Sequence, residues 1–189
     1  MEKIPVILDL DTGIDDSVAL IHALSSEKLD VLGISTVAGN QTVDITTRNT
    51  LALLELTGRT DVPVAAGAAS PLFHPVHTAP EVHGENGIGN AVLPEPQKRP
   101  EPEGAICCLR RWIESSPRPV TIIAVAPLTN IALLLAGYPH LKPKIERLVL
   151  MGGAAFRGNV SPVAEANAHT DAEAAAMVFA AGVPLTMCG

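Results

Sequence analysis

The stretch IPVILDLDTGIDDSVALIHALSS, residues 4–26, joins a strand pattern to a helix pattern through a cluster of acids. The run IPVILDL is apolar and rich in β-branched residues, which is typical of a buried strand. The run DDSVALIHALSS is typical of a helix. Four carboxylates, those of Asp9, Asp11, Asp15 and Asp16, fall where the strand passes into the helix. The segment therefore predicts a strand–helix unit with an unusually acidic turn.

The same alternation of strand and helix patterns continues outward along the chain. Further strands are predicted at VLGISTVAG, PVAAG, PVTIIAVAPL, RLVLMGG and VPLTMCG, and further helices at VDITTRNTLALLELTGR, AICCLRRWIESS, LTNIALLLAG and DAEAAAMVFAAG. Apolar strands that alternate with helices indicate a parallel sheet covered on both faces. We therefore predict a doubly wound α/β fold with a mainly parallel, Rossmann-like core, in a single domain over residues 1–189.

Two segments interrupt this alternation. Residues 70–90, SPLFHPVHTAPEVHGENGIGN, are rich in His, Gly and Pro and are too long for a simple connection. Such a loop is typical of a mobile flap or of a functional site. Residues 94–104, PEPQKRPEPEG, predict an extended surface loop to which no chemistry can be assigned.

Composition and charge narrow the classes of partner. The formal net charge of −7 comes with no basic stripe, which argues against a nucleic-acid partner. A small neutral or cationic ligand, or a metal ion held by carboxylates, suits this balance. The three cysteines have neither metal-ligand spacing nor the even number of a disulfide framework. With no signal-like or membrane-spanning run, we expect a cytoplasmic protein without a membrane partner.

The aspartate cluster predicts a metal site. Like charges packed this closely repel one another unless a cation holds them together. Ligands that are all oxygen indicate Mg²⁺ or Ca²⁺ rather than zinc. The alternative for Asp15 or Asp16 taken singly is a first-turn acid that interacts with the helix dipole. A zinc site among His74, His77 and His83 is a weaker alternative, because these residues lack a helical or knuckle scaffold.

A phosphatase of the haloacid-dehalogenase type is the competing interpretation of the strand and its acids. Such enzymes also open with an apolar strand followed by an Asp-x-Asp pair and use Mg²⁺. Their motif continues with any residue and then Thr or Val, whereas Gly13 follows Thr12 here. Their motif also lacks the two acids that come directly afterwards, so the match is poor.

The motif DLDTGIDD, residues 9–16, resembles the N-terminal signature D-x-D-P/T-G-x-D-D of the inosine–uridine-preferring nucleoside hydrolases. Other blocks resemble the family in the same order, namely VAGNQTVDITTRN, HGENGIGN, VAPLTNIA and MGGAAFRGNVSPVAEANAHTDAEAA. The resemblance covers essentially the whole chain. It implies an enzyme that hydrolyses the N-glycosidic bond of ribonucleosides to ribose and a free base, with Ca²⁺ as cofactor.

The resemblance also implies roles for individual residues. Asp11 would be both a calcium ligand and the general base for the attacking water. Asp16 would be a bidentate calcium ligand, and the backbone carbonyl of Thr129 would be a third. Calcium acidifies water less than zinc does, so a neighbouring carboxylate is needed to complete the deprotonation.

Ribose contacts are implied for a second group of residues. This group consists of Asp15, Asn40, Asn159, Glu165 and Asn167, and His83 would lie near the base. Asn40 would help to hold either the ribose or the nucleophilic water. Asn40 and Asn159 have the alternative of being simple turn residues. Glu165 has the alternative of being a solvated acid at a helix start.

The chain departs from the family in length. Members continue with a segment that supplies another aspartate ligand and, in many, a histidine that protonates the leaving base. We therefore expect a fold truncated at its C-terminus, with an incomplete site. An inactive remnant that binds only metal or ribose is the alternative function. The resemblance further implies a homo-oligomer, dimer or tetramer, for the full-length protein.

Overall fold

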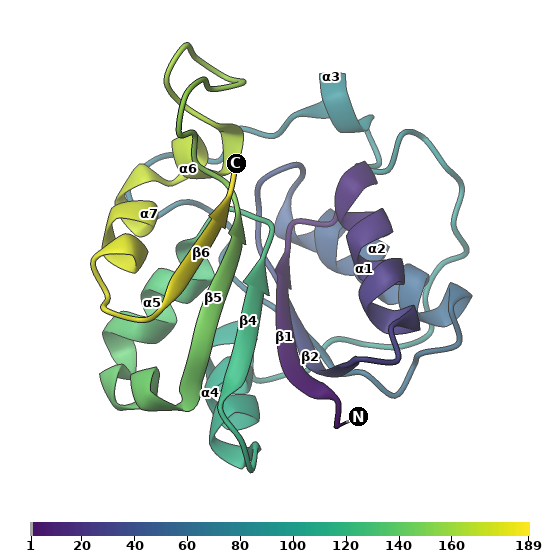
Figure 1. Ribbon diagram of the computed structural model, residues 1–189. Helices are drawn as coiled ribbons and strands as arrows, with labels where there is room; N and C mark the ends of the chain where they lie inside the picture. The colour runs from purple at the N-terminus through teal and green to yellow at the C-terminus, as the bar shows by residue number, and fades with distance from the viewer. Residues whose placement is uncertain (1) are drawn as a thin grey trace.

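The computed structural model describes residues 2–189 and contains a six-stranded parallel sheet with helices on both faces (Figure 1). The strands are β1 (Ile4–Leu10), β2 (Leu29–Thr36), β3 (Val64–Ala66), β4 (Val120–Ala124), β5 (Ile145–Met151) and β6 (Leu185–Cys188). The helices are α1 (Ile14–Ser25), α2 (Val43–Leu56), α3 (Pro80–His83), α4 (Ala105–Ser115), α5 (Thr129–Gly137), α6 (Ala166–Thr170) and α7 (Ala172–Phe179), with a 3₁₀ helix, η1, at Pro139–Lys144.

The strand order β3-β2-β1-β4-β5-β6 confirms the doubly wound fold. From β1 the chain moves outward to β2 and β3, then returns to the opposite side of β1 and continues through β4 to β6, with every pair parallel. The winding direction reverses between β1 and β4. In open sheets of this kind, ligands bind beyond the carboxyl ends of the strands at that switch point.

Side chains of β1 alternate between two hydrophobic cores. Ile7 belongs to a core that also contains residues of α4, α5 and α7. Val6 and Leu8 belong to the opposite core, which contains residues of α1 and α2. Figure 1 shows these two helix groups on opposite sides of the sheet. Because both faces are covered, the strands are apolar throughout, which is why the sequence pattern predicts them.

One glycine of β2 lets a helix approach the sheet closely. A Cβ atom at Gly33 would lie 2.6 Å from the indole ring of Trp112 in α4. Trp112 is 5% exposed, and its ring fills the space that a side chain would otherwise take. Gly33 therefore sets how closely α4 packs against β2.

The Pro-rich segment 94–104, predicted as an extended surface loop, is held against the domain by hydrogen bonds. A side-chain oxygen of Glu55, in α2, accepts hydrogen bonds from the backbone N–H groups of residues 97–98, both at 2.7 Å. The N–H of Glu101 donates to the carbonyl of Val64 in the edge strand β3, also at 2.7 Å. The segment thus covers part of an edge that would otherwise be open to pairing with another chain.

Replacing Glu55 with alanine is expected to lower the free energy of unfolding by about 1–2 kcal/mol, because two main-chain hydrogen bonds lose their acceptor. Limited proteolysis should then cut within residues 94–104 faster than in the wild type. Glu55→Gln keeps an acceptor oxygen and should behave almost like the wild type. Equal proteolysis of the alanine and glutamine variants would show that Glu55 does not hold the segment.

No helix within residues 2–189 is long and apolar enough to cross a membrane.

Candidate active site

Two buried carboxylates occupy the switch point. Asp11 directly follows β1 and is 1% exposed, and Asp16 lies in the first turn of α1 and is 2% exposed. One oxygen of each is already bonded: Asp11 Oδ2 accepts the backbone N–H of Asn40 at 2.7 Å, and Asp16 Oδ2 accepts that of Gly13 at 2.9 Å. The other oxygens, Asp11 Oδ1 and Asp16 Oδ1, are buried without a donor among residues 2–189.

Asn40 links the two carboxylates. Besides its backbone bond to Asp11, its side-chain Nδ2 donates to Asp16 Oδ2 at 3.0 Å. The preceding residue must be glycine, because a Cβ atom at Gly39 would collide with the Asp11 carboxylate. The loop after β2 is therefore shaped to bring Asn40 against both acids, which goes beyond the role of a simple turn residue.

Burial and mutual repulsion work against ionisation of this pair. Burial raises the pKa of Asp11 well above its usual range, and the charge of Asp16 raises it further. Burial likewise raises the pKa of Asp16 to about 7, with the charge of Asp15 adding to the effect. A nearby cation reverses this balance, because it favours the ionised form of both groups.

The donor set fits a hard divalent cation. Asp11 and Asp16 each have one unpartnered carboxylate oxygen, and Asp11 lines a cavity. Oxygen ligands are those that Ca²⁺ and Mg²⁺ prefer. Within residues 2–189, no group of three or more His, Cys, Asp or Glu side chains is arranged to hold a metal. The zinc alternative thus finds no support. The side chains of Asp11 and Asp16 offer only part of a calcium coordination shell.

Thr129 lies beyond the carboxyl end of β4, on the β4 side of the switch point. It begins α5, directly after the loop that follows β4, and β4 pairs with β1. Its side-chain hydroxyl donates to Asp171 Oδ2 at 2.6 Å, and both residues are fully or almost fully buried. The backbone carbonyl of Thr129 thus belongs to a residue that is fixed through its side chain.

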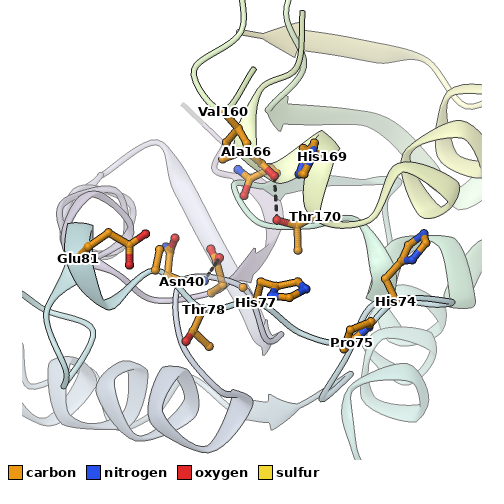
Figure 2. A pocket seen from close by; sticks show the side chains of 14 residues that line it. Asn40, His74, Pro75, His77, Thr78, Glu81, Val160, Ala166, His169 and Thr170 are labelled. Carbon is orange, nitrogen blue, oxygen red and sulfur yellow. Dashed lines mark hydrogen bonds between the residues drawn. The ribbon is translucent and has the colours of Figure 1, made fainter. Parts of the chain in front are cut away.

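A cavity of about 530 Å³ opens next to Asp11 (Figure 2). Its walls are formed by Asp11, Gly39, Asn40, His74, Pro75, His77, Thr78, Ala79, Glu81, Val160, Ala166, Asn167, His169 and Thr170. Figure 2 shows Asn40, Thr78 and His77 on one side of this space, and Val160, Ala166 and His169 on the other. Its volume falls in the range of small-molecule sites.

Of the residues predicted to contact ribose, Asn40 and Asn167 line this cavity. Asn167 Nδ2 also donates to the backbone carbonyls of Val125 and Met151, at 3.2 and 3.1 Å. Asn167 therefore connects the loop that follows β4 to the last residue of β5. Its position at the carboxyl edge of the sheet agrees with a role in the site.

Glu165 is buried beside the cavity rather than solvated. It caps α6, accepting the N–H groups of Asn167 at 2.9 Å and Ala168 at 3.2 Å. It also accepts the N–H of Gly153 at 2.8 Å, so it joins α6 to the end of β5. Asn159 is exposed, and its side-chain oxygen accepts the N–H of Ala166 at 2.8 Å.

Asp15 and His83 lie together at the start of α1, outside the set of residues that line the cavity. His83 is 9% exposed, and its Nδ1 accepts the N–H of Ile14 at 3.3 Å and lies 4.0 Å from an Asp15 oxygen. Since Nδ1 accepts this bond, Nε2 carries the ring proton. A Cβ atom at Gly13 would lie 2.5 Å from Nδ1, so this glycine allows the histidine to dock.

Comparison with known proteins identifies the family. Residues 6–189 match the family described as inosine-uridine preferring nucleoside hydrolase. The chain belongs to that family. The match removes the support for the phosphatase interpretation.

Several known nucleoside hydrolases are close relatives of this chain. It is 51% identical to the pyrimidine-specific ribonucleoside hydrolase RihA of Shewanella woodyi, over 98% of this chain and 59% of the relative. The structure of a purine-preferring ribonucleoside hydrolase from Gardnerella vaginalis superposes with a TM-score of 0.93 at 34% identity, covering 97% of this chain and 60% of that one. A plant nucleoside hydrolase gives a TM-score of 0.92 at 37% identity, covering 98% and 59%. The chain thus spans about three fifths of the length of these relatives.

Two buried polar residues that support the candidate site were missed by the sequence analysis. Asp171 accepts bonds from Thr129 and from the backbone N–H of Leu72. Asn130 donates to Asp9 Oδ1 at 2.8 Å and to the carbonyl of Thr36 at 2.9 Å. Their bonding partners lie far away in the sequence, so neither residue has a local pattern that would have shown its role.

Proposed function

We propose that this protein hydrolyses the N-glycosidic bond of ribonucleosides with the help of a bound Ca²⁺ ion. The observation that carries the proposal is the pair of buried, unpartnered oxygens, Asp11 Oδ1 and Asp16 Oδ1. Asn40 links the two carboxylates, and Asp11 lines a cavity of about 530 Å³. Asp11, Asp16 and the backbone carbonyl of Thr129 would hold the ion. When bound, Ca²⁺ supplies positive charge that keeps both carboxylates ionised and acidifies water.

Asp11 is the proposed general base. Its Oδ2 is held by the N–H of Asn40, which fixes the carboxylate and leaves Oδ1 free to take a proton from the attacking water. Hydrolysis builds positive charge on the ribose ring, and the surrounding carboxylates favour that charge.

Ribose is the proposed occupant of the part of the cavity next to Asp11. Asn40 and Asn167 offer amide groups there. Asp15, Asn159 and Glu165, which are not among the cavity-lining residues, complete the proposed ribose-binding set. His83 is proposed to act near the base. Several oriented polar contacts hold the scissile bond in position for attack.

Pyrimidine ribonucleosides are the proposed preferred substrates. The relative from Shewanella woodyi is named as pyrimidine-specific, as is one from Citrobacter koseri that is 48% identical over 98% of this chain. For the full-length protein we propose a cytoplasmic homo-oligomer, dimer or tetramer. The cysteines Cys107, Cys108 and Cys188 are all free, which agrees with a reducing compartment.

The direct test is ribose release from uridine and from inosine by purified protein, in EDTA and in added Ca²⁺. We expect release that depends on Ca²⁺ and is faster for uridine. Asp44→Asn removes an exposed carboxylate from the first turn of α2 and should leave the rate unchanged. Calcium binding without ribose release from any ribonucleoside would instead establish the alternative, a module that only binds metal or ribose.

A further inference from the structure

The loop that forms one wall of the cavity is anchored at three backbone N–H groups. The N–H of Ala68 donates to Asn130 Oδ1 at 2.9 Å. The N–H of Leu72 donates to Asp171 Oδ2 at 3.0 Å. The N–H of Ala79 donates to the carbonyl of Asn40 at 3.0 Å. Residues 68–79 are here termed the wall loop. Between the second and third of these N–H groups, the wall loop contributes His74, Pro75, His77 and Thr78 to the lining of the cavity.

Each of the three residues that accept these N–H groups is bonded to, or adjacent in sequence to, a residue of the proposed cation site. Asn40 holds Asp11 through its backbone N–H and Asp16 through its side chain. Asn130 is the residue that follows Thr129 in α5. Asp171 is bonded to the hydroxyl of Thr129 itself. The wall loop and the ion ligands therefore share the same small set of supporting residues.

The carboxylate of Asp171 accepts hydrogen bonds from three separate parts of the structure. It is fully buried, and its Oδ2 accepts both the Thr129 hydroxyl at 2.6 Å and the Leu72 N–H at 3.0 Å. Its Oδ1 accepts the N–H of Ala174 at 3.0 Å and thereby caps α7. A single carboxylate thus fixes the residue that begins α5, the wall loop and the start of α7.

Asn130 makes the second connection between the wall loop and α5. Its side-chain oxygen holds the N–H of Ala68, while its Nδ2 donates to Asp9 and to the carbonyl of Thr36. Asn130 is fully buried, so rotation of its side chain would leave these partners without bonds. The root of the wall loop therefore moves only if the start of α5 moves with it.

We propose that Asp171 is a positioning residue that fixes the Thr129 carbonyl and the wall loop together, so that cation binding and ordering of the wall loop are coupled. The inference rests on the proposed function, in which the Thr129 carbonyl is a cation ligand. Coupling between two sites is reciprocal: an ion that favours one arrangement of Thr129 orders the loop, and an ordered loop strengthens ion binding.

Two substitutions of Thr129 test the coupling with little change in shape. Thr129→Val removes the hydroxyl that bonds to Asp171 but keeps the backbone carbonyl, whereas Thr129→Ser keeps the hydroxyl. Calcium affinity is measured by titration calorimetry, and the amides of the wall loop are followed by hydrogen exchange with and without Ca²⁺. We expect Ca²⁺ to slow exchange at Leu72 in the wild type. In Thr129→Val this protection should shrink and the calcium Kd should rise about tenfold, while Thr129→Ser should restore both.

Asp171→Asn provides a second variant, with Asp44→Asn as the control for loss of one carboxylate. Asp171→Asn should weaken calcium binding and abolish the calcium-dependent protection of Leu72, while the control should change neither. Wild-type calcium affinity and loop protection in Thr129→Val would overturn the coupling alone. A wild-type protein that binds no Ca²⁺ would overturn the coupling together with the metal site of the proposed function.

Discussion

The Asp11→Asn variant is expected to release ribose about 10³-fold more slowly than the wild type, a loss in the range for removal of a general base. Asparagine has nearly the same shape, and its side-chain oxygen can still accept the N–H of Asn40. What it lacks is the negative charge that would attract Ca²⁺ and the basic oxygen that would take a proton. The rates are compared at saturating uridine and Ca²⁺, with Asp44→Asn as the matched control.

In the absence of metal, the same substitution should raise the free energy of unfolding, although it lowers the rate of ribose release. Burial and the charge of Asp16 both work against ionisation of Asp11. With EDTA present at neutral pH, Asp11→Asn should therefore unfold at a higher urea concentration than the wild type. Added Ca²⁺ should stabilise the wild type and leave the variant unchanged. Calcium-dependent ribose release that persists in Asp11→Asn would show that another residue is the base.

The metal-free protein is expected to lose stability as the pH rises from about 4 to about 7. Burial raises the pKa of Asp9 from 3.8 to about 6 and that of Asp16 to about 7, and the pKa of Asp11 is raised as well. The folded protein therefore holds more protons than the unfolded chain across this window. Stability then falls with rising pH and levels off above the folded-state pKa values. For Asp9 alone the loss is about 3 kcal/mol.

Urea unfolding at several pH values in EDTA measures this dependence. Exposed acids contribute their own slopes, so the useful quantity is the difference between the wild type and Asp9→Asn, which lacks one titrating group. As the pH rises from 4 to 7, the free energy of unfolding of the wild type should fall relative to that of Asp9→Asn. Saturating Ca²⁺ should reduce the fall in the wild type, because the ion favours ionised carboxylates. A pH-independent difference would mean that Asp9 titrates normally in the folded state.

The fold could be predicted from sequence because its strands are buried on both faces. Such strands form continuous apolar runs, as in IPVILDL, and helical patterns separate them regularly. The short helices α3 and α6 and the 3₁₀ helix η1 were not predicted as elements. Elements of four to six residues contain too few turns for an apolar period to show. Proline at the start of α3 and η1 sets their first turns instead.

The acidic part of the site could be predicted for a similar reason: its residues are concentrated in one turn. Asp11 and Asp16 are five positions apart and remain close in space. Asn40 follows the neighbouring strand, so its approach to both is a consequence of parallel pairing between β1 and β2. The supporting residues could not be found in this way. Asp171 and Asn130 look like an ordinary helix cap and an ordinary first-turn residue until the sheet brings their partners to them.

The bonds made by Asp171 and Asn130 also have a consequence for the time at which the site forms during folding. The pair Asp9–Asn130 is separated by 121 residues, and the pair Leu72–Asp171 by 99. Contacts this distant close large loops and form slowly compared with local ones. On a ribosome that adds about 5–20 residues per second, β1 and its aspartates wait many seconds before Asp171 is even synthesised. During that wait the four acids of DLDTGIDD remain in water, where their repulsion is weak. Asp9, Asp11 and Asp16 are buried only when the scaffold that holds them is complete.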